Sequence, residues 1–143
     1  MKKVAQFAGL GLAFLLAACG TGSQPKPGEV ERYDGIGEAE TIKLTGTEPF
    51  WGMTISGGML TYTTPENIGG STAAAIRFSG NGGLGFSGTL DGQALQVAVT
   101  PGDCSDGMSD RIYPFTATVT LGETMLTGCG YTGNHPFRGE ENP

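Results

Sequence analysis

The chain has 143 residues, of which 14 are acidic and 8 are basic, and its formal charge is −6. This length suits one domain with a sizeable core, and the acidic balance argues against nucleic acid, whose phosphates need cationic partners. The single histidine, His135, stands close to the C-terminus. The sequence contains no Ser/His/Asp set, no phosphate-binding loop and no cluster of metal ligands. We therefore expect a protein that is not an enzyme and that needs no cofactor or metal.

The first eighteen residues have the pattern of a secretory signal. Lys2 and Lys3 form a positive start, and the mostly apolar run over residues 4–18 is shorter than the roughly 20 residues of a membrane-spanning helix. The run ends in LAAC at residues 16–19, which resembles the lipobox of bacterial lipoproteins. This resemblance implies that Cys19 becomes the first mature residue and carries acyl chains. The alternative is an ordinary signal peptide cleaved after small residues, with Cys19 incidental.

Acyl chains on Cys19 would anchor the protein in a lipid bilayer, because each buried methylene contributes about 0.8 kcal/mol. Gly20 stands where enterobacterial lipoproteins of the inner membrane have Asp. By this similarity, we expect a lipid anchor in the outer membrane of the cell envelope, with the protein on the periplasmic face. Removal of residues 1–18 takes away two lysines and leaves 14 acidic and 6 basic residues, a formal charge of −8. A basic protein partner is compatible with that charge.

The mature chain divides into a tether, a domain and a tail. Residues 19–38 are predicted to be a lipidated cysteine and a flexible tether, because they are rich in glycine, proline and charge. The C-terminal sequence GNHPFRGEENP has a similar unstructured character. We place the domain at residues 39–137 and a disordered tail at residues 138–143.

Within the domain, apolar residues alternate with small or polar ones, as in strands that bury one face. Signals such as Asn81-Gly82 and Asp91-Gly92 separate the alternating runs and favour tight hairpins. We therefore predict an all-β fold, a small antiparallel meander that closes into a barrel of seven or eight strands, with a β-sandwich as the alternative. The predicted strands lie near residues 40–46, 50–56, 59–64, 73–79, 84–90, 93–99, 112–121 and 124–130.

The alternation also predicts which side chains point inward. In the run PFWGMTISG, we expect Trp51 and the residues at every second position after it to face the interior. In the run AAAIRFSG, we expect Ala74, Ile76 and Phe78 to point inward and Arg77 to point outward.

Three cysteines leave one pair if Cys19 carries lipid. Outside the inner membrane the envelope is oxidising, so Cys104 and Cys129 are expected to form a disulfide, which would contribute about 3 to 3.5 kcal/mol by restricting the unfolded chain. A redox-active pair is the alternative, but the sequence has no C-x-x-C spacing. Zinc would need more ligands than two cysteines and one histidine.

The segment TPGDCSDGMSDR at residues 100–111 concentrates acidic residues next to Cys104. We interpret it as an ordered connection with a turn at Asp106-Gly107, in which Arg111 pairs with Asp106 or Asp110. Calcium binding by Asp103, Asp106 and Asp110 is disfavoured, because the spacing differs from that of calcium loops and Arg111 is adjacent. Catalysis by paired carboxylates has no support in the spacing. A protein-binding loop with Met108 as an exposed tip is the remaining functional alternative.

A second candidate site is the sequence GTEPFW. Trp51 is the only tryptophan, and after Pro49 it is expected to plug one end of the barrel. The alternative is a ligand pocket formed by Phe50 and Trp51. Glu48 beside them would be an exposed turn residue or a buried hydrogen-bond acceptor.

Motifs over residues 44–130 resemble a family of uncharacterised bacterial envelope lipoproteins. They are GTEPFW, CSDGMSDR followed by YPF, and the closing L-x-G-C. The resemblance implies a small disulfide-bonded β domain of a kind that sometimes occurs beside META-like domains or domains similar to membrane-bound lysozyme inhibitors. Inhibitors of C-type lysozyme carry a Ser-Gly-x-x-Tyr signature, and neither Ser79-Gly80 nor Ser87-Gly88 has a tyrosine three residues after the glycine.

Three functions remain open after these observations. The first is a binding or envelope-maintenance module of undefined molecular activity. The second is a lysozyme-inhibitor-like protein that binds a basic enzyme. The third is a carrier of a small apolar ligand, which requires a hollow barrel lined by Trp51, Tyr62, Phe78 and Phe86.

Overall fold

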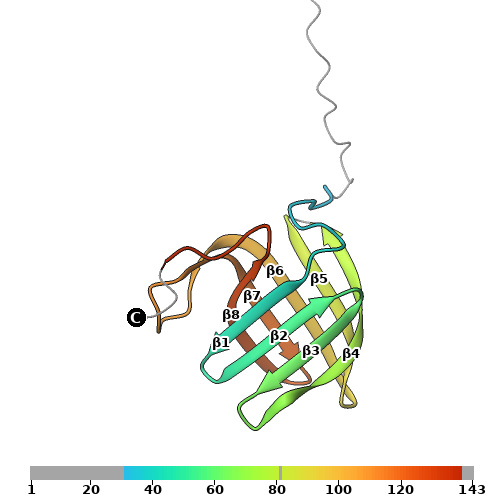
Figure 1. Cartoon of the computed structure of the whole chain (residues 1–143). Coiled ribbons are helices and arrows are strands. Elements are labelled where there is room, and N and C mark those ends of the chain that lie inside the picture. Colours follow the sequence, from blue (N-terminus) through green and yellow to red (C-terminus); the bar gives the residue numbers. More distant parts are fainter. Residues whose placement is uncertain (1–30, 81, 140–143) are drawn as a thin grey trace, which may run out of the picture.

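The computed structural model describes residues 31–80 and 82–139. Eight strands run antiparallel to their neighbours, and β8 pairs with β1, so that the sheet closes into a barrel (Figure 1). The predicted all-β meander barrel is confirmed, and the β-sandwich alternative is wrong. The strands are β1 (Ile42–Thr47), β2 (Phe50–Ser56), β3 (Met59–Thr64), β4 (Asn67–Gly80), β5 (Gly83–Leu90), β6 (Gln93–Ser105), β7 (Ile112–Leu121) and β8 (Thr124–Thr132).

Tight turns connect neighbouring strands. Asp91 and Gly92, between β5 and β6, both have positive φ angles, of 49° and 81°. A two-residue hairpin that matches the right-handed twist of its strands needs such a pair, and Asp-Gly adopts it at low cost. Gly57 and Gly58 form a similar pair between β2 and β3, with φ angles of 57° and 77°. The turn signals in the sequence therefore correspond to the reversals of the chain.

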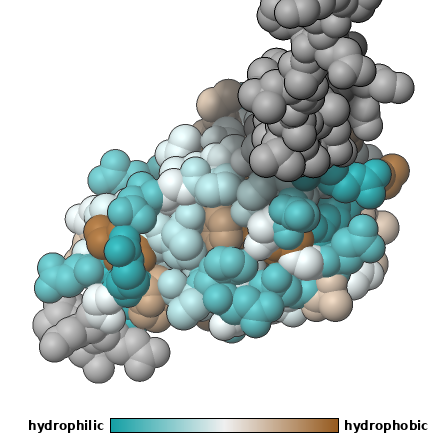
Figure 2. All heavy atoms as spheres, turned by 90° about the horizontal axis from the view of Figure 1, so that it is seen from above, coloured by the Kyte–Doolittle hydropathy of each residue, from teal (hydrophilic) through white to brown (hydrophobic). Residues whose placement is uncertain are grey.

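Side chains fill the interior of the barrel. Leu60, Val99 and Val119 are fully buried, and Ile36, from the segment before β1, is 1% exposed. Their removal from water is the main source of stability for such a barrel. Seen from above, the outer surface is mostly hydrophilic, with apolar groups between the polar ones (Figure 2). Because Ile36 packs into the core, the domain begins earlier than the predicted boundary at residue 39.

Strand β4 faces the opposite way from our prediction. Ile76 and Phe78 are 76% and 60% exposed, and Ala74 is exposed as well. The Arg77 guanidinium instead reaches the end of the barrel and donates hydrogen bonds to the backbone carbonyl of Ile36, at 2.6 Å, and to that of the next residue, at 3.1 Å. These carbonyls belong to the segment that covers the barrel end, and a charged donor satisfies them. The predicted inward face of β4 is therefore wrong.

Two strands, β4 and β6, are longer than predicted by six residues or more. β4 begins earlier than expected, at Asn67, and its first residues pair with the end of β3. β6 continues to Ser105, with a shift of register between Pro101 and Cys104. The connection that we expected over residues 100–111 is therefore a strand extension followed by a shorter turn.

The segment after β8 packs on the barrel. Arg138 and Ile112 exchange two backbone hydrogen bonds of 2.9 Å. The ring of Phe137 lies 5.4 Å from that of Tyr113, which is buried. Aromatic packing and backbone pairing therefore order this part of the chain, and the prediction of an unstructured tail is wrong for Arg138. Residues 140–143 lie outside the described residues.

The predicted signal segment, Cys19 and the first part of the tether also lie outside the described residues. In the part of the chain that the structure describes, no helix is long and apolar enough to cross a membrane. Because Cys19 is outside the described residues, lipid anchoring through it stays a prediction from the sequence.

Candidate functional site

One disulfide fixes the position of the extended end of β6. Cys104 is bonded to Cys129 of β8, with an S–S distance of 2.02 Å and a Cα–Cα distance of 5.6 Å. This bond confirms the predicted pairing. β7 lies between β6 and β8 in the barrel, so the bond links the β6 extension, which pairs with β7, to a strand that is not its neighbour.

Asp106 organises the turn after β6. Its carboxylate accepts hydrogen bonds from the amide N–H groups of Met108, at 2.9 Å, and Ser109, at 2.8 Å. The hydroxyls of Ser109 and Tyr113 donate to it at 2.7 Å and 3.3 Å. Burial acts to raise the pKa of Asp106, but these bonds favour the charged form, and the resulting pKa is lowered. Four donors occupy the carboxylate oxygens, which favours a structural role over metal binding or catalysis.

We expect Asp106→Ala to lower the free energy of unfolding by about 2 kcal/mol, because the amides of the turn lose a charged acceptor. Asp103→Ala is the matched control. Asp103 pairs with Arg138 on the surface, where the two side chains are 76% and 70% exposed, and such pairs contribute about 0–1 kcal/mol. Urea unfolding followed by circular dichroism measures both variants. A loss of equal size in the two would contradict the role assigned to Asp106.

The lowered pKa of Asp106 also predicts a pH dependence. The contribution of this carboxylate to stability is fully present above its unfolded-state pKa of about 3.9, and it is lost as the pH falls through the lower folded-state value. The stability difference between wild type and Asp106→Ala should therefore be constant near neutral pH and shrink below about pH 4. A difference that already declines between neutral pH and about pH 6 would contradict this assignment.

The C-terminal segment also contacts the turn and the end of β6 that precedes it. The Arg111 guanidinium lies 4.5 Å from the centre of the Phe137 ring, within the range of a cation–π interaction. Arg138 donates two hydrogen bonds of 3.0 Å to the carboxylate of Asp103. The predicted loop residues Asp103, Asp106 and Arg111 therefore contribute to the structure of the turn.

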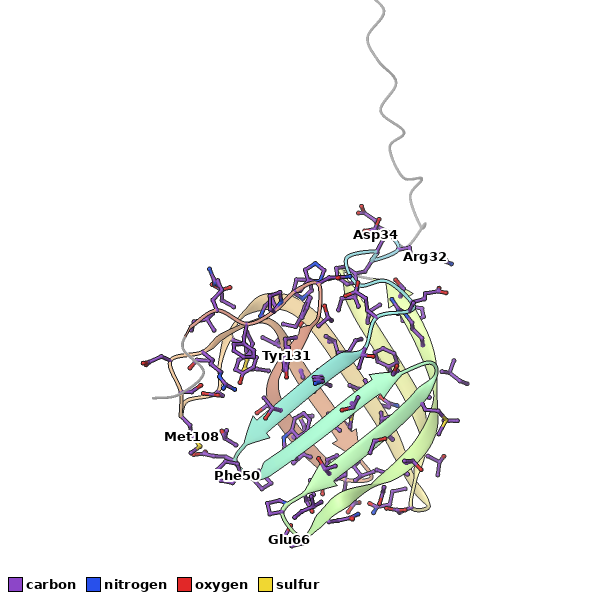
Figure 3. All side chains as sticks on the ribbon, viewed as in Figure 1. Arg32, Asp34, Phe50, Glu66, Met108 and Tyr131 are labelled. Atoms are coloured by element: carbon purple, nitrogen blue, oxygen red, sulfur yellow. A yellow bond between two sulfur atoms is a disulfide. The ribbon has the colours of Figure 1, made fainter. Side chains whose placement is uncertain are left out.

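The tip of the turn presents Met108, which is 63% exposed, and Asp110, which is also exposed. The Thr47 hydroxyl donates a hydrogen bond of 2.9 Å to the carbonyl oxygen of Asp106, which joins the turn to the end of β1. Phe50, at the start of β2, is 52% exposed. Figure 3 shows Met108 and Phe50 projecting at the same end of the barrel. The two candidate sites in the sequence thus come together at this end.

A cleft of about 530 Å³ opens between the turn and the outer face of β1, β7 and β8. Glu48 and Met108 line it, together with both cysteines of the disulfide. Threonine hydroxyls supply most of the other polar groups along its walls. These are Thr45, Thr47, Thr116, Thr118 and Thr127. We refer to the cleft and the turn over residues 106–111 together as the turn site.

The predicted pocket of Glu48, Phe50 and Trp51 divides between two environments. Glu48 and Phe50 belong to the surface, whereas Trp51 is 4% exposed and fills this end of the interior, as the alternation predicted. Its indole lies over Gly46 and Gly128, where an added Cβ would come within 2.0 Å of Nε1 and 2.8 Å of Cζ2, respectively. The indole Nε1 is buried and makes no hydrogen bond within the described residues. Trp51 therefore has a core role. It also lines, together with Phe50, a surface depression of about 210 Å³, so a ligand pocket of these two residues stays a prediction.

No protein-family model, no curated protein and no solved structure matches this chain. Over residues 31–80 and 82–139, no group of three or more His, Cys, Asp or Glu side chains is arranged to hold a metal ion. The turn site is therefore described from its own geometry alone.

Sequence reasoning missed Thr47 and Tyr113, which form hydrogen bonds with Asp106 from β1 and β7. Thr47 approaches the turn because closure of the barrel brings β1 beside β8, whereas Tyr113 lies across the β6–β7 hairpin from Cys104.

Proposed function

We propose that this protein is an outer-membrane lipoprotein, anchored through Cys19 with its barrel in the periplasm, and that the barrel is a binding module for a basic protein. The observation that carries the proposal is the exposed side chain of Met108, at the tip of a turn held by the disulfide and by Asp106. A pre-ordered turn loses little conformational entropy on binding, and an apolar tip beside a cleft is suited to a pocket on a partner.

The filled interior favours binding at the outer surface over carriage of a small ligand inside the barrel. Trp51 and Phe86 are packed in the core, and Phe78, which a hollow carrier would need inside, points outward. The turn site contains three carboxylates, those of Glu48, Asp106 and Asp110, and the guanidinium of Arg111, in a mature chain of formal charge −8. Negative charge at a binding surface raises the rate of encounter with a cationic partner.

A C-type lysozyme is the first basic partner to test. The motifs of this chain resemble those of lipoproteins that sometimes occur beside lysozyme-inhibitor-like domains. The Ser-Gly-x-x-Tyr signature is absent from the sequence, and the Ser79 hydroxyl donates its hydrogen bond to the backbone carbonyl of Tyr33. An inhibitory contact of this chain would therefore use the turn site. Slower hydrolysis of cell walls by lysozyme in the presence of the wild-type chain, but not of Met108→Asp, would support this function.

The turn site can be tested in cells with a photoreactive phenylalanine analogue in place of Phe50 in the full chain. We expect an adduct with a basic envelope protein, which mass spectrometry identifies. Met108→Asp should reduce the adduct by about tenfold or more, because a charge at the tip loses its hydration when the complex forms. Met59→Asp is the matched control. Met59 is 49% exposed on β3 and should leave the adduct unchanged.

Two results would refute the proposal. One is an adduct that Met108→Asp and Met59→Asp reduce equally, because the turn would then have no special part in binding. The other is an adduct with an acidic protein, because the charge of the turn site would then oppose the complex.

A further inference from the structure

A second surface carries large apolar side chains that are exposed and are not part of the core. Ile76 and Phe78 project from the outer face of β4. Their neighbours across the sheet are small, since Phe78 pairs with Gly85 on β5, and Gly85 pairs with Ala98 on β6. The two large side chains therefore border an apolar groove of about 340 Å³ on the outside of β4–β7. We refer to it as the β4 groove.

The chain that leads to the anchor enters the domain at the edge of this groove. The Ser79 hydroxyl donates a hydrogen bond to the carbonyl of Tyr33, and Arg32 and Phe78 line the same surface depression. Figure 1 shows the segment before β1 crossing the end of the barrel next to the hairpin of β4 and β5. Phe78 thus lies between the β4 groove and the point where the N-terminal segment meets the barrel.

We infer that the β4 groove docks on the lipid bilayer that holds the anchor, with Ile76 and Phe78 at the boundary between headgroups and acyl chains. The inference goes beyond the proposed function and rests on its lipid anchor at Cys19. Residues 19–30 connect the anchor to the described chain, and a segment of that length reaches at most about 40 Å. The tether therefore keeps the barrel near the bilayer, and it enters the barrel beside the β4 groove.

Because of the tether, a small apolar surface is enough to orient the barrel on the bilayer. Two exposed apolar side chains hold a free protein on a bilayer only weakly. A tether converts docking into an intramolecular step at high effective concentration, so weak insertion then determines the orientation of the barrel. The contact is apolar, because it is made by Ile76 and Phe78, and the arginines of the neighbouring depression, Arg32 and Arg77, lie beside it together with Glu38. It therefore does not require anionic lipid.

The β4 groove and the turn site meet on β7, where Thr118 lines both. Their distinctive residues are farther apart. Ile76 and Phe78 stand on β4, which is three strands from β1 and four from β8 in the closed order. Docking centred on these two side chains would therefore leave Glu48 and Met108 outside the contact with the membrane.

The test uses the full lipidated chain in vesicles of phosphatidylethanolamine and phosphatidylcholine. Cys19 is acylated and the other two cysteines are bonded, so a cysteine introduced by Ile76→Cys is the one free thiol for an environment-sensitive fluorophore. Thr54→Cys, at an exposed position on β2, is the matched control. We expect lipids with a nitroxide in the acyl chain to quench the label at residue 76 at least about threefold more strongly than the label at residue 54.

Equal quenching at both positions, in protein that floats with the vesicles, would overturn the inference and leave the anchor intact. A blue-shifted label at residue 76 without quenching would also overturn it, because the groove would then be covered by protein, such as a second copy of the chain. Protein that does not float with the vesicles would overturn the anchor at Cys19 and the docking that rests on it. Phe78→Ser should abolish the difference in quenching without releasing the protein from the vesicles.

Discussion

Trp51→Ala is expected to lower the free energy of unfolding by about 4 kcal/mol, the cost of removing a large aromatic side chain from a packed core. The Trp51 side chain is 4% exposed, and its indole covers Gly46 and Gly128. Because glycine has no side chain at either position, little is available to fill the cavity that the alanine leaves. Urea unfolding followed by far-ultraviolet circular dichroism measures the change, since the variant has no tryptophan to report by fluorescence.

Phe50→Ala is the matched control for this prediction. Phe50 precedes Trp51 in the chain but points to the opposite side of the sheet and is 52% exposed. Its truncation should cost less than about 1 kcal/mol in stability. Equal losses in the two variants would mean that the indole does not plug the barrel end. Phe50→Ala should instead weaken binding at the turn site.

Replacing Cys104 and Cys129 together by serine is expected to lower the free energy of unfolding by about 3.5 kcal/mol, because the bond closes a long loop in the unfolded chain. The two cysteines are 25 positions apart in the sequence. The same double variant should also reduce cross-linking from position 50, because the β6 extension is no longer fixed to β8. Urea unfolding of the full chain measures the first effect.

A thiol assay provides the direct check on this bond. Protein taken from unreduced periplasm should resist alkylation at Cys104 and Cys129, and it should react at both after reduction. Free alkylation of both thiols without reduction would contradict the bond. A double variant as stable as the wild type would contradict its contribution to stability.

Alternation and turn chemistry predicted most of the barrel. The runs that contain Trp51, Leu95 and Phe115 place apolar side chains at every second position, and these side chains are buried. The Asp91-Gly92 turn has the positive φ angles that its sequence indicates. These features are local, because a strand needs one apolar face and a tight hairpin needs residues that tolerate left-handed backbone.

Features that depend on the ends of the barrel were not predictable from local pattern. The run AAAIRFSG has apolar residues on one face and Arg77 on the other, which is also the pattern of an inward-facing apolar strand. The orientation is reversed, and in it Arg77 donates to the carbonyl of Ile36 at the barrel end, a contact that the run itself does not indicate. The order of the C-terminal segment likewise depends on the Tyr113 ring, against which Phe137 packs.

The candidate site was predictable in its parts and not in its assembly. Glu48, Phe50 and Met108 each belong to a motif that the sequence distinguishes. Their proximity requires the pairing of β1 with β8 and the extension of β6 past its register shift. The first event joins strands that are distant along the chain, so no local pattern marks it. The second occurs within the β6–β7 hairpin, where Pro101 and Gly102 indicated the end of a strand in the sequence.

The central claim is that the barrel is a filled scaffold that binds at its outer surface. Native mass spectrometry of the full lipidated chain, released from detergent, tests this claim most directly. We predict one mass, that of residues 19–143 with acyl groups on Cys19 and one disulfide, and the same mass after denaturation. A small molecule present in proportion to the protein and lost on denaturation would contradict the filled interior and would favour a carrier.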